Sequence, residues 1–171
     1  MVRPVFKDTL QIAIVVRNLD EAVRRYYDEY GIGPWAIYEF NPQVVKDMII
    51  RDRRINYAMR LALCNIGRVQ WELIEPKDDV SIYAEFLRKH GEGLHHIALG
   101  VDDYDEAMKF FREKGHIVLQ GGTWFGLTYT YLDTEDALKF VAEIYKIPEG
   151  FKWPKPDAVY PPGARISWIE D

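Results

Sequence analysis

The sequence predicts an α+β protein built from two βαβββ modules. Residues 11–22 (QIAIVVRNLDEA) are repeated 85 positions later as residues 96–107 (HIALGVDDYDEA), with six of the twelve positions identical. Each copy begins with alternating apolar residues, which is a strand pattern, and continues into a helix start. Further strand-like segments follow each copy, so the repeat covers a whole module rather than a single motif.

Both copies carry the same helix-start signal. A polar residue is followed three positions later by glutamate, the spacing of a capping box, and the pairs are Asn18 with Glu21 and Asp103 with Glu106. The segments EAVRRYYDEY (21–30) and EAMKFFREK (106–114) are the predicted helices. Gly31 and Gly115 follow them, and glycine at this position favours a left-handed helix end.

Later strands are predicted from apolar segments between turn residues. They are WAIYEF (35–40), MIIRD (48–52), NYAMRLALC (56–64), VQWELIE (69–75), HIVLQ (116–120), TYTYLD (128–133) and KFVAEIY (139–145). Gln11 and Glu72 are 61 positions apart in the first copy, whereas His96 and Glu143 are 47 apart in the second. The first copy therefore carries about 14 extra residues, which we place near residues 39–56.

The chain divides into four segments on this pattern. We expect a first module over residues 9–76, a helical linker over 77–93 with Ser81 as its N-cap, and a second module over 94–148. Residues 149–171 form a tail whose segment GFKWPKPDAVYPPG has four prolines. Proline removes a backbone donor, so we expect no regular structure there and a course along the surface or a partner subunit.

Composition excludes several classes of protein. The chain is 48% hydrophobic and 29% charged, and no apolar run approaches the roughly 18 residues of a membrane span. An acid, Asp8, precedes the first short apolar run and no signal-cleavage pattern follows, so we expect a cytoplasmic protein. A net charge of −5 argues against nucleic acid as a partner. The single cysteine, Cys64, excludes an intramolecular disulfide and is expected to be a buried apolar residue.

Two adjacent histidines open the second repeat. Neighbouring strand residues face opposite sides of a sheet, so His95 and His96 are not expected to enter one site. The repeat aligns His96 with Gln11, and small residues follow on its face, which leaves space for a cavity. Glu72 and Glu143 also lie at paired positions, so twofold pseudosymmetry gathers all four polar residues. The alternative is that His96 is a core histidine with one satisfied hydrogen bond.

The paired modules resemble a known family. The segments GLHHIALGVDD, GIGPW and ELIEP are similar to those of the vicinal oxygen chelate superfamily, and the resemblance covers roughly residues 9–148. This superfamily includes glyoxalase I, methylmalonyl-CoA epimerase, extradiol dioxygenases and bleomycin-resistance proteins. The resemblance implies a cupped, mostly antiparallel eight-stranded sheet with a metal ion on its concave side, and a homodimer.

The resemblance also implies a ligand set. Carried over by position, the metal ligands are Gln11, Glu72, His96 and Glu143, which suit Zn²⁺, Ni²⁺, Co²⁺ or Mn²⁺. This set resembles that of zinc-type glyoxalase I, whereas methylmalonyl-CoA epimerases usually begin the first strand with His. The segment GRVQWELIEPKDDVSIYAEFLRKHGEG, in contrast, looks more like the epimerase branch. Dioxygenase activity is disfavoured because it needs two histidines and one carboxylate.

The implied function is metal-dependent proton transfer on a small-molecule thioester or hemithioacetal. Lactoylglutathione lyase-like and methylmalonyl-CoA epimerase-like reactions both fit, with Glu143 as the first candidate base, Glu72 as the second and Glu39 as a further one. The arginines of the insert region do not distinguish a CoA carrier from a glutathione carrier; they are Arg51, Arg53, Arg54 and Arg60.

Two other function classes remain open. The first is a metal-free binding protein of the bleomycin-resistance type, favoured by the 14% aromatic content. The aromatic residues that support it are Trp35, Trp71, Trp124 and Tyr129. The second is an interaction module for a larger enzyme, for which the sequence carries no dedicated feature. Metal content separates the enzyme from the binding protein.

Overall fold

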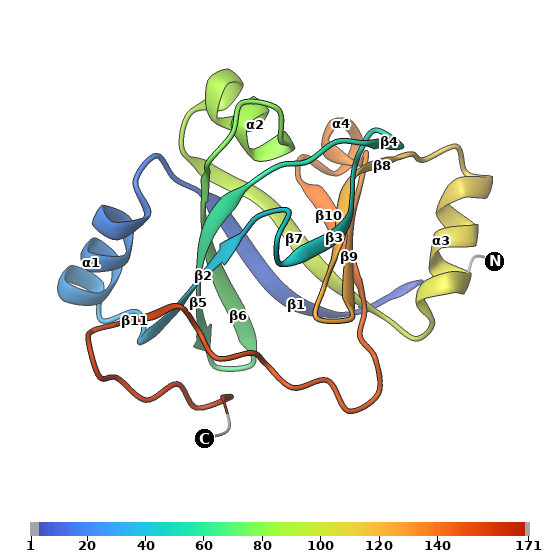
Figure 1. The fold of residues 1–171 in the computed structure, drawn as a ribbon. Coiled ribbons are helices and arrows are strands. Elements are labelled where there is room, and N and C mark those ends of the chain that lie inside the picture. Colours follow the sequence, from blue (N-terminus) through green and yellow to red (C-terminus); the bar gives the residue numbers. More distant parts are fainter. Residues whose placement is uncertain (1–3, 170–171) are drawn as a thin grey trace.

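Two antiparallel strands, β1 (Phe6–Val15) and β7 (Gly93–Val101), form the centre of the molecule. They are the opening strands of the two sequence repeats. In the computed structural model, which describes residues 4–169, they lie in the middle of one open sheet of eleven strands (Figure 1). The sheet bends into a cup with helices outside it, so the predicted α+β class and cupped sheet are confirmed. The predicted number of eight strands is too low, because the sheet is extended at its two edges by the further strands Val45–Ile50, Arg53–Arg54 and Ala158–Tyr160.

The first half continues with a helix and three strands in the predicted order. These elements are α1 (Leu19–Tyr30), β2 (Trp35–Phe40), β5 (Met59–Ile66) and β6 (Val69–Pro76). Strand β6 pairs in parallel with β1, and β5 and β2 follow it in antiparallel pairs. The side chain of Asn18 accepts a hydrogen bond from the backbone N–H of Glu21, which confirms the predicted cap of α1.

The second half repeats this plan. Its elements are α3 (Tyr104–Glu113), β8 (Val118–Trp124), β9 (Leu127–Leu132), a short α4 (Glu135–Leu138) and β10 (Val141–Lys146). Strand β10 pairs in parallel with β7, as β6 does with β1. Helix α2 (Ile82–His90), capped by Ser81, links the halves as predicted, and Asp103 caps α3.

The extra segment of the first repeat forms strand β3 (Val45–Ile50) and the short β4 (Arg53–Arg54). Both lie inside the interval predicted for the insertion. Strand β3 pairs with β8, so a segment that belongs to the first repeat extends the sheet of the second half. Arg51 and Asp52 turn the chain between β3 and β4 with positive φ angles of 48° and 60°.

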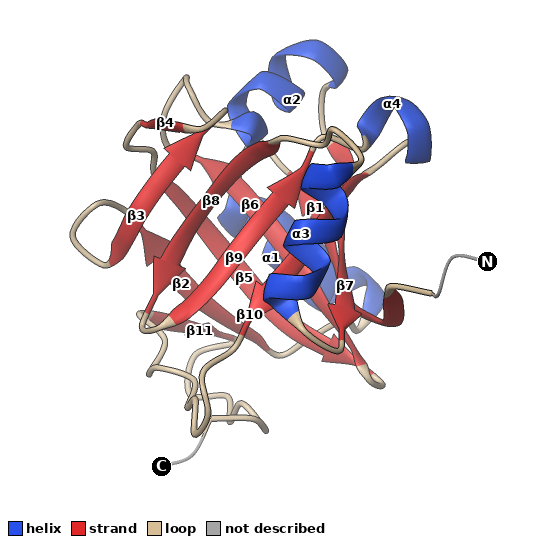
Figure 2. Ribbon diagram, turned by 90° about the vertical axis from the view of Figure 1, so that its right-hand side faces the viewer, coloured by secondary structure: helices blue, strands red, loops and turns tan. Residues whose placement is uncertain are grey.

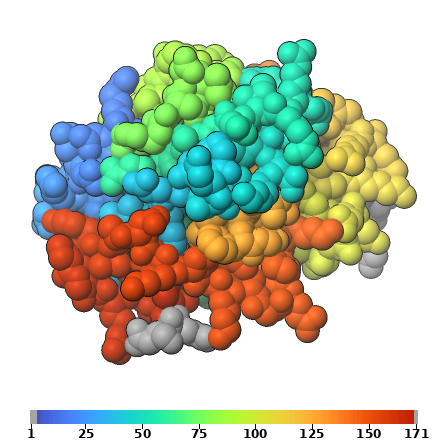
Figure 3. All heavy atoms as spheres, in the orientation of Figure 1, coloured from blue at the N-terminus to red at the C-terminus, as the bar shows by residue number. Residues whose placement is uncertain are grey.

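The C-terminal tail contains a strand, contrary to the prediction of no regular structure. Strand β11 (Ala158–Tyr160) pairs with β2, and it fits between Pro156 and Pro161. Proline excludes a ladder hydrogen bond only at its own position, so three proline-free residues suffice for an edge strand. The tail leaves β10 in the second half and crosses to β2 in the first (Figure 1), covering the lower surface in Figure 3.

The complete strand order is β11-β2-β5-β6-β1-β7-β10-β9-β8-β3-β4. Helix α1 buries Leu19 against Trp35 and Cys64 on one outer face of the sheet, which confirms the expected burial of the cysteine. Helix α3 buries Phe111 against Leu132 on the same outer face, in the second half of the sheet. Figure 2 shows α3 lying across the strands of that half. No helix within residues 4–169 is both long and apolar enough to cross a membrane.

Leu19 provides a test of how α1 is held. It is fully buried, so Leu19→Ala leaves a cavity and should lower the free energy of unfolding by about 2–5 kcal/mol. Leu138→Ala, at a position that is 44% exposed, should change it by less than about 1 kcal/mol. Urea denaturation of both variants measures the difference, and equal losses would show that α1 does not depend on this contact.

Candidate functional site

A cavity of about 220 Å³ lies inside the cup, and its floor is made by the central strands. Gln11, Glu72 and Glu143 line it, whereas His96 lies fully buried behind the two carboxylates. The remaining walls are largely aliphatic and aromatic; no Lys or Arg of the described chain lines the cavity. It therefore presents a few buried polar groups at the end of an apolar space.

Strand register explains why these four side chains meet. Ala13 on β1 pairs with Glu72 of β6 on one side and with His96 of β7 on the other. Ala98 on β7 likewise pairs with Gln11 of β1 and with Glu143 of β10. The two alanines are equivalent in the sequence repeat and both are fully buried, so four long side chains converge around two small ones.

His96 contacts both carboxylates. Its Nε2 atom lies 3.2 Å from Oε2 of Glu72 and 3.2 Å from Oε2 of Glu143. Burial alone would lower the pKa of His96, but the neighbouring Glu143 and Glu72 carboxylates raise it to about 9. Burial raises the pKa of Glu72, and the nearby imidazole opposes that shift. In the absence of a metal ion, a charged imidazole is therefore favoured between the two carboxylates.

The two adjacent histidines contact each other, although strand alternation predicted opposite faces. Nδ1 of His95 and Nδ1 of His96 are 2.8 Å apart, and both side chains are buried. The alternation rule is wrong here because of a register shift: Ala13 pairs with His96 but Ile14 pairs with Leu94. His95 is the extra residue of this bulge, which re-aims its side chain.

His95 has a definite role in this contact. Burial, together with the His96 charge, keeps the pKa of His95 well below its usual range, so its ring is neutral. A neutral ring can accept through Nδ1 the proton that His96 carries on its own Nδ1. That hydrogen bond orients the His96 ring with Nε2 directed at the carboxylates, as outer partners orient histidines in metal sites.

Two residues that the sequence reasoning missed hold the Gln11 amide. The Gln11 Nε2 atom donates to Oε1 of Gln70 at 2.7 Å. The Tyr145 hydroxyl lies 2.8 Å from Gln11 Oε1 and 2.9 Å from Glu143 Oε2. Period-two alternation could have found both, because Gln70 precedes Glu72 by two residues and Tyr145 follows Glu143 by two.

The arrangement of these donor atoms bears on whether they can bind a divalent ion. Within residues 4–169, no three His, Cys, Asp and Glu side chains are arranged to hold a metal ion by themselves. Ligand atoms bound to one ion at about 2.0–2.2 Å lie roughly 2.8–3.6 Å apart, depending on the coordination geometry, and His96 Nε2 lies 3.2 Å from an oxygen of each carboxylate. Glu72 Oε2 and His96 Nε2 are also buried without a well-formed hydrogen bond. The Gln11 oxygen also has two lone pairs, so the chemistry of these four side chains suits a divalent ion, although the described residues are not arranged around one.

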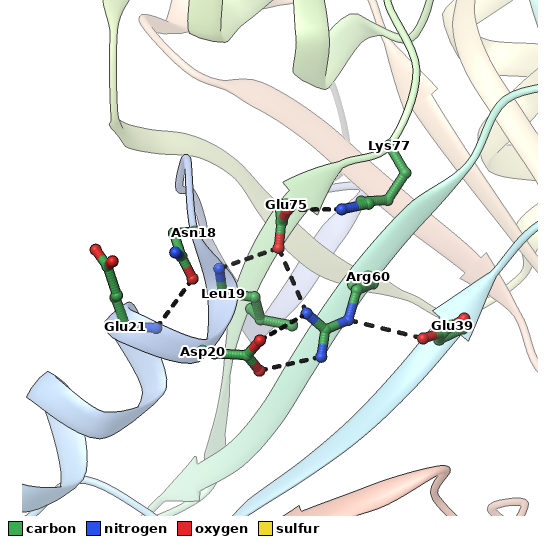
Figure 4. Close-up of polar contacts among 8 residues, drawn as sticks. All are labelled: Asn18, Leu19, Asp20, Glu21, Glu39, Arg60, Glu75 and Lys77. Atoms are coloured by element: carbon green, nitrogen blue, oxygen red, sulfur yellow. Dashed lines mark hydrogen bonds and ion pairs between the residues drawn. The ribbon is translucent and has the colours of Figure 1, made fainter.

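The further candidate base, Glu39, lies outside the cavity. Its side chain is 60% exposed and its Oε1 lies 3.8 Å from Nε of Arg60 (Figure 4). Arg60 in turn forms two 3.0 Å contacts with Asp20 and a longer one with Glu75. Arg51 pairs with Glu85 at 2.7 Å. Both arginines hold surface ion pairs in this structure, and Glu39 belongs to the same polar surface.

The predicted aromatic residues divide into two groups. Trp124 and Tyr129 line the cavity, whereas Trp35 and Trp71 pack beneath α1 on the outer face of the sheet. The sequence reasoning missed further aromatic wall residues, which are Phe40, Tyr131, Tyr145 and Trp153. Burial keeps the pKa of the Tyr129 hydroxyl well above its usual range, so this hydroxyl adds a polar but uncharged group to the aromatic part of the wall.

Comparisons with known proteins agree with this fold. Residues 10–130 match the family model described as Glyoxalase/Bleomycin resistance protein/Dioxygenase superfamily. A hypothetical protein of Bacillus halodurans superposes with a TM-score of 0.65 and 22% identity, covering 85% of this chain and 98% of its own. Streptomyces coelicolor methylmalonyl-CoA epimerase in complex with 2-nitronate-propionyl-CoA superposes with a TM-score of 0.62 and 26% identity. This match covers 87% of this chain and 99% of the epimerase chain.

A curated relative matches a shorter stretch. The 4-hydroxyphenylpyruvate dioxygenase of Legionella pneumophila is 34% identical over 85 residues, which is 47% of this chain. The match covers 24% of the dioxygenase, so the chain spans about a quarter of that protein's length. This similarity concerns one module-sized region of a larger enzyme.

The charged cluster predicts a pH-dependent stability for protein stripped of metal with a chelator. The pKa of His96 is about 9 in the folded chain and about 6.5 when unfolded, so its stabilising effect is complete below about pH 6.5. That effect is lost as pH rises through about 9. Urea denaturation across this range should show the decline, and His96→Gln should flatten it. If the free energy of unfolding of His96→Gln declined with pH as steeply as that of the wild type, His96 would not be the group responsible for the decline.

Proposed function

The chain belongs to the glyoxalase/bleomycin resistance protein/dioxygenase superfamily, and on this premise we propose that it is a metal-dependent enzyme of the glyoxalase type. Its reaction would move a proton on a carbon beside the carbonyl of a small thioester or hemithioacetal, as a lyase or an epimerase. The observation that carries the proposal is the meeting of Gln11, Glu72, His96 and Glu143 around Ala13 and Ala98.

Those four polar residues would hold a divalent ion such as Zn²⁺, Ni²⁺, Co²⁺ or Mn²⁺. When bound, the ion would stabilise the negative charge that develops on two neighbouring substrate oxygens. His95 supports this role because its hydrogen bond to Nδ1 leaves Nε2 of His96 for ligation. The Tyr145 hydroxyl lies within hydrogen-bond distance of both the Gln11 oxygen and Glu143, and its single proton is donated to one of them at a time.

Glu143 is the proposed base. Its carboxylate lines the cavity, is 2% exposed, and receives a hydrogen bond from Tyr145 at Oε2. It would take a proton from the substrate carbon and return it to the same or the adjacent carbon. Glu72 contacts the same His96 nitrogen from β6. It is therefore the proposed second acid–base residue, which would deliver the proton to the opposite face of the substrate carbon in an epimerisation.

The cavity limits which part of a substrate enters. No Lys or Arg among the described residues lines it, so neither the phosphates of CoA nor the carboxylates of glutathione find a cationic partner inside. Structural neighbours include a methylmalonyl-CoA epimerase in complex with methylmalonyl-CoA and NH4+. We propose that only the acyl or hemithioacetal end occupies the cavity and that the carrier remains outside.

A metal-free binding protein is the second candidate. It is favoured by the direct contacts between His96 and the carboxylates, which satisfy part of the cluster without an ion. The hydrogen bonds that occupy the Gln11 amide favour it as well. In that case the aromatic cavity would hold an apolar ligand and the polar cluster would contribute only to its recognition.

Metal analysis separates the two candidates. The enzyme should retain about one divalent ion per chain after dialysis against Zn²⁺, Ni²⁺, Co²⁺ or Mn²⁺, because the four proposed ligands lie beside Ala13 and Ala98 on neighbouring strands. His96→Ala should lose the ion, whereas His90→Ala, a surface change in α2, should keep it. Elemental analysis measures the content, and a wild-type protein that binds no ion would support the binding protein instead.

Glu143→Gln tests the proposed base. The amide keeps the shape of the side chain but cannot take a proton, so turnover should fall by at least about a hundredfold. Two substrates are assayed. The first is the hemithioacetal that methylglyoxal forms with glutathione, and the second is methylmalonyl-CoA.

Glu39→Gln is the matched control, because this exposed carboxylate lies outside the cavity and its loss should leave turnover near that of the wild type. Circular dichroism establishes that both variants fold. Undiminished turnover in Glu143→Gln would remove this residue from the role of base and leave Glu72 to be tested in the same way.

A further inference from the structure

A tryptophan from the C-terminal tail forms part of the cavity wall. Trp153 lines the cavity although it lies beyond both modules and beyond the region that matches the family model. Its ring centroid is 6.0 Å from that of Trp124, which itself lies at the end of β8. This part of the wall therefore comes from a segment outside the two repeated modules.

The tail that carries Trp153 is fixed on both sides. It leaves β10 in the second half of the molecule and is bound to β2 in the first (Figure 1). The Tyr38 hydroxyl donates to the backbone oxygen of Pro154 at 2.9 Å, directly after the tryptophan. Asp157 then donates its N–H to Ile37 and accepts through Oδ2 from the N–H of Glu39. These contacts give Trp153 a fixed place across the cup.

Three aromatic residues from distant segments meet at this wall. The Phe40 ring of β2 lies 4.8 Å from the Trp124 ring, at an interplanar angle of 32°. The Trp153 and Trp124 rings are tilted at an interplanar angle of 56°, and all three residues line the cavity. Aromatic rings gain extra attraction from other rings at these separations, beyond what burial alone provides.

We propose that Trp153, Trp124 and Phe40 form an aromatic clamp that selects substrates with an aryl group beside the oxygens that face Glu72 and Glu143. The proposal rests on the proposed function and specifies its substrate class. A cavity of roughly 150 Å³ already holds benzene. The 220 Å³ here accommodates one ring and a short oxygen-bearing group, but no large carrier.

Two neutral probes isolate the effect of the ring. They are 2-hydroxyacetophenone and 1-cyclohexyl-2-hydroxyethanone, which share two neighbouring oxygens and differ only in an aryl or a saturated ring. Neither is charged, so neither is repelled by the carboxylates of Glu72 and Glu143. Isothermal titration calorimetry of the full chain, with and without added Zn²⁺, gives the ratio of the two dissociation constants.

The wild type should bind the aryl probe about five- to tenfold more tightly than the cyclohexyl probe, the scale that ring contacts supply. Trp153→Phe should keep most of this preference. Trp153→Leu, which keeps an apolar side chain, should reduce it to about twofold or less. Trp71→Leu is the matched control, since Trp71 packs beneath α1 outside the cavity and its loss should leave the ratio unchanged.

Equal affinities of the wild type for the two probes would overturn the clamp, as would no binding of either. A Trp153→Leu variant that folds, by its melting curve, and weakens both probes equally would also overturn it. Because the readout is a ratio of affinities, it does not depend on turnover. An aryl preference in a chain that binds no Zn²⁺ would retain the clamp and remove the proposed enzyme function.

Discussion

The close pairing of β1 with β7 is the constraint on which the site depends. Ala13 and Ala98 face the neighbouring long polar residues from equivalent positions of the two repeats, and both are fully buried. A side chain larger than alanine at either position would occupy the place where the polar residues converge. The twofold plan of the fold thus brings together residues that the chain separates by more than 130 positions, as Gln11 and Glu143 are.

Burying two carboxylates and an imidazole is costly unless each charge has a partner. His96 pairs with both carboxylates, Tyr145 donates to Glu143, and His95 contacts the far nitrogen of His96. The cluster is therefore electrostatically satisfied in part, yet Glu72 Oε2 lacks a well-formed hydrogen bond. The carboxylate charge that remains unpaired favours binding of a divalent ion. The direct ion pairs between His96 and the two carboxylates compete with that binding.

The sequence predicted the repeats, the helix caps and the four polar positions because each follows from local pattern or register. It failed where a single residue changes that register: the extra residue in β7 turns His95 toward His96. The rule that proline excludes strands failed for the tail because it was applied to a segment rather than to single positions. Trp153 could not be predicted to line the cavity, since no local pattern reports which strand a tail will cross to.

The two halves are alike at the centre and different at the edges. Strand β3 of the first repeat joins the second half, and the tail that follows the second half joins the first. These exchanges leave the paired positions around Ala13 and Ala98 unchanged, and the tail adds Trp153 to the cavity wall. The symmetric centre therefore holds the residues for which we propose chemistry, while the proposed selection of substrate falls to residues such as Trp153 that the repeat does not duplicate.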